Sequence, residues 1–371
     1  MISVFGSYVG EEEIANVTSC MREQWLGFGK NVEIFEKKYM EKFGLKSFAM
    51  VDSGSNALFM AIKLLNLPPG SEVILPTFTW VSCAQAILMA GLRPVFCDVD
   101  LNTMNVRFED IKSKITPNTS AIMVVHYAGL PVDIDPIIEL GYFKPVPVIE
   151  DAAHAVNSTY KGRPCGTIGD IGIFSFDAIK NLTTGEGGGI TARKSELIER
   201  AKVMRYCGIG KSGFESAMTN GGRWWEHHIE EPFIKMLPTN MAAGIGIAQL
   251  DRLDALQGRR KGIWDYYQEE FAGISSVTTP IEPEPGDRHS YFTYCIRCLM
   301  RDELAHYLLK EGIYTTLRYH PLHLNAIYGQ TGVWLPNAEQ LNSDALNIPL
   351  HPRMTDEDVM KVVGKIREFY E

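Results

Sequence analysis

The chain has 371 residues, 45% of them hydrophobic and 22% charged, so it can bury a large core and is long enough for a large and a small domain. Its 45 acidic and 36 basic residues give a net charge of −9, which argues against nucleic acid or an anionic membrane as the main partner. No apolar stretch reaches the length of a membrane span, and residues 1–13 lack the features of an export signal. We therefore expect a cytoplasmic protein.

The cysteines indicate neither a disulfide framework nor a metal site. Their number, seven, is odd, and the chain is much longer than disulfide-rich secreted domains. Cys295 and Cys298 have the spacing of redox or zinc pairs, but they lie in a predicted strand, and no second pair or histidine cluster stands nearby in the sequence. We expect both to be packed thiols.

The N-terminal part predicts two helices, one after Glu11 and one from Val32 to Phe43, and then a strand at 48–51. The next helix begins at Ser53-Gly-Ser-Asn, where serine hydroxyls are suited to cap it. This turn allows two interpretations. It is either a capped helix start and no more, or an anion site in which free N–H groups and the positive end of the helix dipole hold a phosphate.

Further apolar runs predict the strands of a mostly parallel sheet that is covered on both faces, at residues 72–76, 93–98, 120–126, 145–151 and 171–176. Ligands of such sheets bind beyond the carboxyl ends of the strands. Trp80, His126, Asp151 and Lys180 each follow one of these runs. We expect them to converge, although they span a hundred positions.

The C-terminal part predicts a second unit. Residues 191–230 read as helical and then irregular, and a long helix begins near Asn240. A proline-rich stretch at 275–287 leads to a small α/β unit. Its predicted elements are a strand at 290–298, a helix at 301–311, a strand at 314–319 and a helix capped by Thr355. We place a large domain at 1–254 and a small domain at 255–371.

Lys180 is the candidate for covalent chemistry. It lies among apolar residues such as Phe176, Ile179 and Leu182, and burial there would lower the pKa of its amine and make it nucleophilic. A lysine that forms a Schiff base needs this environment. The glycines of Gly185–Gly189 would let the backbone approach a ligand closely.

Four motifs stand in one order along the chain: "SGSNAL" at 53–58, "PTFTWVS" at 76–82, "EDAAHA" at 150–155 and "FSFDAIKNLTTGEGG" at 174–188. In these motifs the sequence resembles the DegT/DnrJ/EryC1/StrS sugar aminotransferases, which are fold-type I pyridoxal-phosphate enzymes. The resemblance covers essentially the whole chain. It implies an α/β fold, with a mostly parallel seven-stranded sheet in the large domain and a smaller C-terminal α/β domain, and pyridoxal 5'-phosphate as the cofactor.

The resemblance also implies roles around the cofactor ring. Lys180 would carry the cofactor, and Asp151 would keep the nitrogen of the cofactor ring protonated. Lys180 and Asp151 are therefore the two expected catalytic residues. Trp80 would stack on the ring, and His154 would contact the ring hydroxyl. Other interpretations stay open: Asp151 as a helix cap, Trp80 as a core or interface residue, and His154 as a buried core histidine.

The phosphate cup would be formed by Gly54, the amides of Ser55 and Asn56, and the hydroxyl of Ser175. Members of the family complete it with a residue from the other subunit, usually an asparagine. The matching place here holds Lys235, and a cation suits a phosphate. We therefore expect a homodimer with shared active sites.

The implied reaction moves an amino group from L-glutamate to a ketosugar, with the C4 ketone of a nucleotide-linked 4-keto-6-deoxyhexose or pentose favoured. Arg318 and His320 are the candidate substrate-binding residues. Arg318 could bind a donor carboxylate or a nucleotide phosphate, or be a surface arginine at a strand edge. Amination at C3, a cyclitol ketone and a non-catalytic paralogue that binds the cofactor remain alternatives. An oxidoreductase with a dinucleotide-binding fold is a weak hypothesis. Such a fold needs a G-x-G-x-x-G turn after an early strand, and the turn here is Ser-Gly-Ser-Asn.

Overall fold

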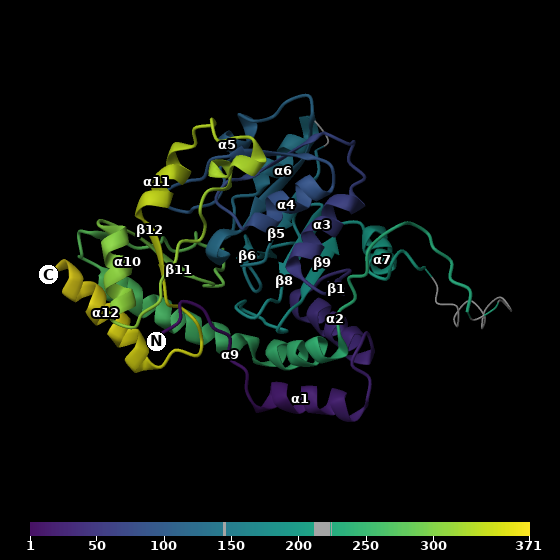
Figure 1. Ribbon diagram of the computed structural model, residues 1–371, viewed down its shortest axis with the longest axis horizontal. Helices are drawn as coiled ribbons and strands as arrows, with labels where there is room; N and C mark the ends of the chain where they lie inside the picture. The colour runs from purple at the N-terminus through teal and green to yellow at the C-terminus, as the bar shows by residue number, and fades with distance from the viewer. Residues whose placement is uncertain (144–145, 211–222, 224) are drawn as a thin grey trace.

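The computed structural model describes residues 1–371 except 144–145, 211–222 and 224 (Figure 1). Its centre is a seven-stranded sheet in the order β1-β9-β8-β5-β4-β2-β3. The strands are β1 (Ala49–Val51), β2 (Glu72–Pro76), β3 (Arg93–Cys97), β4 (Thr119–Val125), β5 (Val148–Asp151), β8 (Ile171–Ser175) and β9 (Gly188–Ala192). Only β9 runs against its neighbours β1 and β8, and the other pairs are parallel. The predicted mostly parallel sheet is confirmed.

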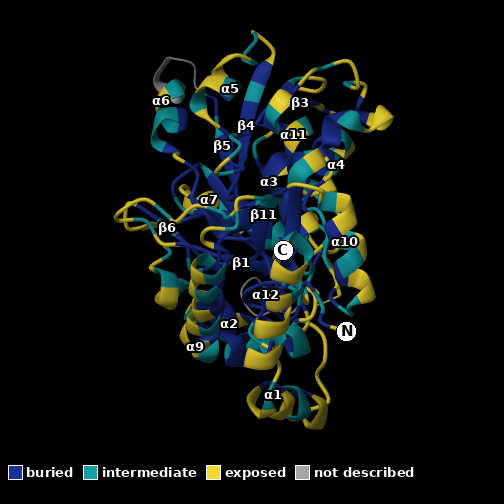
Figure 2. Ribbon diagram, turned by 90° about the vertical axis from the view of Figure 1, so that its left-hand side faces the viewer, coloured by how far each residue is buried: buried dark blue, intermediate teal, exposed yellow. Residues whose placement is uncertain are grey.

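Helices cover this sheet, and its central strands are therefore buried along their whole length (Figure 2). Their near-continuous apolar sequences predict this burial. The helices of this part are α2 (Lys30–Phe43), α3 (Gly54–Leu64), α4 (Val81–Met89), α5 (Phe108–Lys112), α6 (Asp135–Phe143) and α7 (Ser195–Met204). From α2, Phe35 and Tyr39 join Phe48, Phe174 and Phe176 in a buried aromatic cluster. This cluster fixes the strand that precedes Lys180.

Two of the glycines after Lys180 serve packing within the protein, and the expected approach of this backbone to a ligand stays a prediction. Gly188 and Gly189 lie in β9. A Cβ atom on Gly188 would lie 2.4 Å from the backbone carbonyl of Ser53, and one on Gly189 would lie 2.3 Å from the Phe48 ring. Glycine at these positions therefore lets β9 press against the start of α3 and so fixes that helix terminus.

The long helix α9 (Asn240–Phe271) is capped by Thr239, whose side chain accepts a hydrogen bond from the amide of Ala242. Helix α1 (Glu11–Arg22) packs along it (Figure 1). Because α9 runs unbroken across residue 254, it joins the two predicted domains, and the division itself stays a prediction.

A second core gathers buried side chains of residues 263–366 together with Ile2. It surrounds a three-stranded sheet of β10 (Val277–Thr278), β11 (Tyr294–Cys298) and β12 (Ala345–Ile348). Its helices are α10 (Arg301–Lys310), α11 (Pro336–Asp344) and α12 (Asp356–Tyr370). The cap of α12 by Thr355 is confirmed. The short elements of the chain are β6 (Thr159–Tyr160), β7 (Arg163–Pro164), η1 (Tyr127–Gly129), η2 (Leu322–Leu324) and η3 (Ala326–Tyr328).

Two expectations for this half of the chain are wrong. Residues 314–319 form no strand. Thr316 makes one isolated bridge with Asn347, and the side-chain oxygen of Asn347 accepts a hydrogen bond from the amide of Arg318. The helix expected from residue 191 is limited to 195–204. After it, Tyr206 pairs with Lys235 and Ile209 with Ile229, so that these residues form two limbs of an arm that extends from the body (Figure 1). The part of this expectation at 211–222 and 224 lies outside the described residues.

The expected state of the cysteines is confirmed. Cys295 and Cys298 are buried in β11, and all seven cysteines are free. None of the helices formed by the described residues is long and apolar enough to cross a membrane.

Candidate active site

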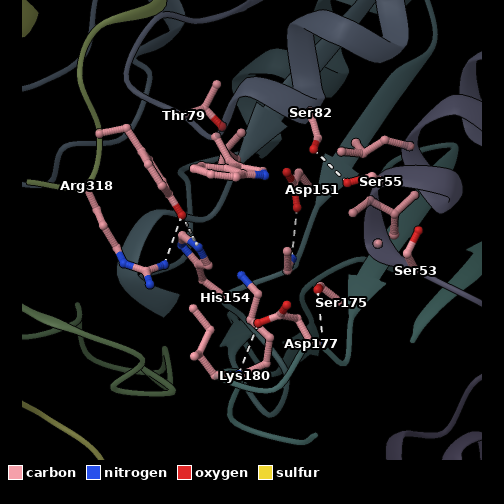
Figure 3. A pocket seen from close by; sticks show the side chains of 18 of the residues that line it. Ser53, Ser55, Thr79, Ser82, Asp151, His154, Ser175, Asp177, Lys180 and Arg318 are labelled. Atoms are coloured by element: carbon pink, nitrogen blue, oxygen red, sulfur yellow. Dashed lines mark hydrogen bonds between the residues drawn. The ribbon is translucent and has the colours of Figure 1, made fainter. Parts of the chain in front are cut away.

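A cavity of about 350 Å³ lies where the predicted residues converge (Figure 3). Asp151 ends β5, Ser175 ends β8, and Trp80 lies between β2 and α4. Lys180 follows β8 and lines the same cavity. His126 does not: it is fully buried and its Nε2 lies 3.0 Å from Glu150, which accepts hydrogen bonds from the amides of residues 166, 168 and 169. His126 therefore holds a loop and not a ligand.

Lys180 has the electrostatics of a nucleophilic amine. Its side chain is 9% exposed. Burial first, and then the positive charge of Arg318, lowers the pKa of Lys180 to about 8, while Asp151 and Asp177 act in the opposite direction. The amine Nζ lies 4.7 Å from the centre of the Phe292 ring. A lysine in this state is partly deprotonated near neutral pH.

Asp151 is held by both oxygens of its carboxylate. Oδ1 accepts the amide of Ala153 at 2.9 Å, and Oδ2 accepts the thiol of Cys83 at 3.1 Å. Residues 152–157 form turns and no helix, so the interpretation of Asp151 as a helix cap is wrong. The carboxylate is 4% exposed and lines the cavity, where it can meet a ligand nitrogen.

The start of α3 meets the end of β8 to form a polar end of the cavity. Gly54 makes this contact possible, because a Cβ atom there would lie 2.7 Å from the Cβ of Ser175. Ser55 and Ser82 share a hydrogen bond of 2.7 Å between their hydroxyls. Hydroxyls and the positive end of the α3 dipole thus gather at one place, and this arrangement suits a phosphate.

Asn56 lies outside the cavity lining. Its amide donates to the Oγ of Ser53 at 3.2 Å, and its side chain donates to Asp52 at 2.7 Å. Ser53, the N-cap of α3, does line the cavity. Ser53 therefore joins the cavity lining, and a role of the Asn56 amide in the phosphate cup stays a prediction.

His154 lines the cavity as a neutral side chain, because burial first, and then the positive charges of Lys180 and Arg318, lower its pKa well below the ordinary value. Its Nε2 lies 3.0 Å from the hydroxyl of Tyr319, and its Nδ1 has no hydrogen-bond partner among the described residues. Trp80 is 54% exposed and faces Tyr319 at 5.6 Å between ring centres. Trp80 and Tyr319 both line the cavity, where their rings lie next to each other.

Arg318 is a buried cation, 7% exposed, and not a surface residue at a strand edge, so that alternative is wrong. Its guanidinium carbon lies 3.6 Å from the centre of the Phe5 ring and 5.1 Å from that of Phe292. Its Nη1 donates to the hydroxyl of Tyr319 at 3.2 Å. Within the described part of the chain, Nε has no hydrogen-bond partner and no carboxylate pairs with the guanidinium. The site can therefore accept an anion from outside the chain.

Two further predicted residues, besides His126 and Asn56, lie away from the cavity of their own chain. His320 is exposed, and its Nδ1 lies 3.0 Å from the Oδ1 of Asn342. Lys235 is exposed on the arm. Sequence reasoning also missed Phe5, Cys83, Tyr319 and Phe292. Only Tyr319 carried a signal, as the aromatic neighbour of Arg318.

Residues 7–367 match the model of the DegT/DnrJ/EryC1/StrS aminotransferase family. The chain is 35% identical, over 100% of its length and 97% of the relative's, to the dTDP-4-dehydro-2,3,6-trideoxy-D-glucose 4-aminotransferase of Saccharopolyspora spinosa. It is 36% identical to the spore coat polysaccharide biosynthesis protein SpsC of Bacillus subtilis, over 97% of this chain and 95% of that protein.

Solved structures agree with these relatives. The aminotransferase TlmJ of Streptoalloteichus hindustanus superposes with a TM-score of 0.93 at 38% identity, covering 99% of this chain and 98% of that chain. The PMP form of the putative sugar aminotransferase Spr1654 of Streptococcus pneumoniae gives 0.92 at 28% identity, over 100% and 99% of the two chains. The chain belongs to the DegT/DnrJ/EryC1/StrS aminotransferase family and is a sugar aminotransferase that depends on pyridoxal phosphate.

Proposed function

We propose that this aminotransferase moves an amino group from L-glutamate to the C4 ketone of a nucleotide-linked 4-keto-6-deoxyhexose or pentose. One observation carries the chemistry: the buried amine of Lys180, with its pKa lowered to about 8, shares a cavity with the carboxylate of Asp151. The choice of C4 is supported by the 35% identical relative, whose name places its reaction at that carbon.

The residues present fit the cofactor. The hydroxyls of Ser53, Ser55 and Ser175 would hold its phosphate at the start of α3, beside Gly54. Asp151 would face the ring nitrogen, and the exposed ring of Trp80 would cover one face of the cofactor ring. When bound, the cofactor supplies an electron sink for the charge that develops on the α-carbon of the amino donor.

Lys180 would then act as the acid–base group. Its Nζ would take the proton from the α-carbon of the donor and deliver it to the cofactor side. A pKa of about 8 suits this task, because an efficient general base titrates near the working pH. In its neutral form, His154 can hydrogen-bond to the ring hydroxyl without adding charge to the site.

Arg318 would bind the α-carboxylate of the donor. It is buried, lacks a carboxylate partner in the described part of the chain, and shares the Phe292 ring with Lys180, whose amine lies 4.7 Å from that ring's centre. The α-carboxylate of an amino acid is close to the carbon that reacts, whereas the phosphates of a nucleotide-linked sugar are remote from C4. These relations favour the donor carboxylate over a nucleotide phosphate as the partner of Arg318. His320 remains a candidate for binding the sugar nucleotide.

The direct test of the substrate follows the cofactor spectrum in both directions. L-Glutamate should convert the protein-bound absorbance band to that of the amine form, and a panel of nucleotide-linked 4-amino, 3-amino and cyclitol amines should then identify the second substrate by the same change. We expect the 4-amino sugars to react fastest. Faster reaction of the 3-amino sugars or of cyclitol amines would overturn the choice of C4. A spectrum that no amine changes would indicate a non-catalytic paralogue.

We further propose a homodimer in which Lys235 of the partner subunit contacts the cofactor phosphate. Support comes from the arm, which extends from the body and exposes Ile229, Ile234 and Lys235 (Figure 1). Exposed apolar side chains beside a cation suit an interface better than water, and two-fold dimers are the commonest assembly. The absence of disulfides among the seven cysteines, all of them described, further supports action in the cytoplasm.

Mixed dimers test the shared site. Lys180→Ala and Lys235→Ala chains should each be poorly active, and subunit exchange should restore part of the activity by uniting both wild-type lysines in one site. The Lys180→Ala chain alone should fold and show no turnover. If heterodimers form and remain as inactive as their parents, Lys235 does not serve the partner's site.

A further inference from the structure

A buried thiol contacts the carboxylate of Asp151 without lining the cavity itself. Cys83 lies near the start of α4 and is 0% exposed. Its Sγ is 3.1 Å from Oδ2 of Asp151 and 3.2 Å from Oγ1 of Thr79. Asp151 and Thr79 line the cavity, and Cys83 does not. Cys83 can therefore act on a ligand only through the carboxylate.

The direction of these hydrogen bonds follows from the groups present. An ionised carboxylate only accepts hydrogen bonds, so the S–H of Cys83 has to donate to Asp151. The thiol has one hydrogen, so the hydroxyl of Thr79 has to donate to the sulfur. Burial, reinforced by the negative charge of Asp151, raises the pKa of the Cys83 thiol well above its ordinary value. The sulfur therefore keeps its hydrogen, and Thr79, Cys83 and Asp151 form a donor chain.

We propose that Cys83 is a positioning residue that fixes the rotation of the Asp151 carboxylate, so that it meets the ring nitrogen of the cofactor. The proposal rests on the proposed function, because that function makes the ring nitrogen the partner of Asp151. The second anchor is the amide of Ala153, 2.9 Å from Oδ1. With both oxygens held, the carboxylate cannot turn about its terminal bond. A thiol is a weak donor, so it orients the carboxylate while competing little with the ring nitrogen.

Three variants separate positioning from packing. Cys83→Ala removes the donor, and Cys83→Ser keeps a donor in nearly the same place. Cys97→Ala is the matched control, because Cys97 is also a buried thiol of this domain, 3.4 Å from the carbonyl of Leu75 and away from the cavity lining. Thermal unfolding of each variant checks that it is folded.

Cys83→Ala should slow the half-reaction with L-glutamate about tenfold, which corresponds to about 1.4 kcal/mol of barrier. In Cys83→Ser the rate of this half-reaction should lie within about threefold of the wild-type rate, and in Cys97→Ala it should equal the wild-type rate. KM for glutamate should stay unchanged in all three variants, since Cys83 touches no substrate. A Cys83→Ser variant as slow as Cys83→Ala would overturn the proposal, because lost packing would then explain both.

A second readout needs neither cofactor nor turnover. The S–H stretching band of cysteine lies in an infrared window free of other protein bands, and the difference between wild type and Cys83→Ser isolates the band of Cys83. We expect a shift to lower frequency than a free thiol shows, and a partial return in Asp151→Asn. An unshifted band would overturn the inference alone. If the visible absorbance of the bound cofactor does not change with any amine, the proposed function is refuted instead. The infrared band of Cys83 then still tests its contact with Asp151.

Discussion

The amine of Lys180 should titrate near pH 8 in the cofactor-free protein. Burial is the larger cause of the lowered pKa, and the charge of Arg318 is the second. At pH 7 a pKa of about 8 leaves roughly one tenth of the molecules with a free amine, against about one in 3,000 for an ordinary lysine. The structure thus increases the reactive fraction about 300-fold at that pH.

Competitive labelling measures this pKa directly. The cofactor-free protein is treated with a trace of acetic anhydride from about pH 6 to about pH 11, and the extent of labelling is read from peptide masses. The exposed Lys310 in the same digest serves as the reference for the reagent. Labelling of Lys180 should have its midpoint near pH 8.

The Arg318→Met variant tests the causes. Loss of the positive charge should move the midpoint of Lys180 upward, while burial should keep it below 10.5, the ordinary lysine value. A wild-type midpoint at or above this ordinary value, or a downward movement in Arg318→Met, would refute the electrostatic reasoning about this site.

Three further outcomes follow from the same geometry. Lys180→Met should raise the free energy of unfolding of the cofactor-free protein at pH 7 by about 3 kcal/mol, because the native amine binds its proton more weakly than the unfolded one. The wild type regains this stability as the pH rises from about 8 to 10.5, so the difference in urea unfolding should shrink over that range, and a constant difference would contradict the lowered pKa. Asp151→Asn should keep the cofactor bound but slow the glutamate half-reaction, followed by stopped-flow absorbance, by several orders of magnitude. A slowing of only a few-fold would mean that the carboxylate merely stabilises the turn that follows β5. Arg318→Met should raise KM for L-glutamate about 100-fold or more, as expected for a lost charged contact of about 3 kcal/mol, with little change for the sugar substrate, and the opposite pattern would assign Arg318 to the nucleotide phosphate.

The half of the cavity that lies at the sheet could be predicted from the sequence, because parallel strands end at one edge of the sheet. Trp80, Asp151 and Lys180 each follow a buried apolar run, and the topology alone brings them together. Their short spacing from the strand ends leaves little freedom in where they lie.

The other half could not be predicted, because it comes from irregular segments. Phe5 reaches the cavity from a segment with no predicted element. Tyr319 lies in the segment 314–319, whose sequence predicts a strand but which forms only one bridge among the described residues, to Asn347. The glycines of β9 show the same limit: the close approach of Gly188 to Ser53 depends on tertiary packing, which leaves no local signal.

Borohydride trapping tests the central claim most directly. Reduction of the protein loaded with pyridoxal phosphate should fix the cofactor on the peptide that contains Lys180, and prior incubation with L-glutamate should abolish the adduct, because the amino group then resides on the cofactor and the lysine is free. A cofactor fixed on another lysine, or an adduct at Lys180 that persists after glutamate, would contradict the account.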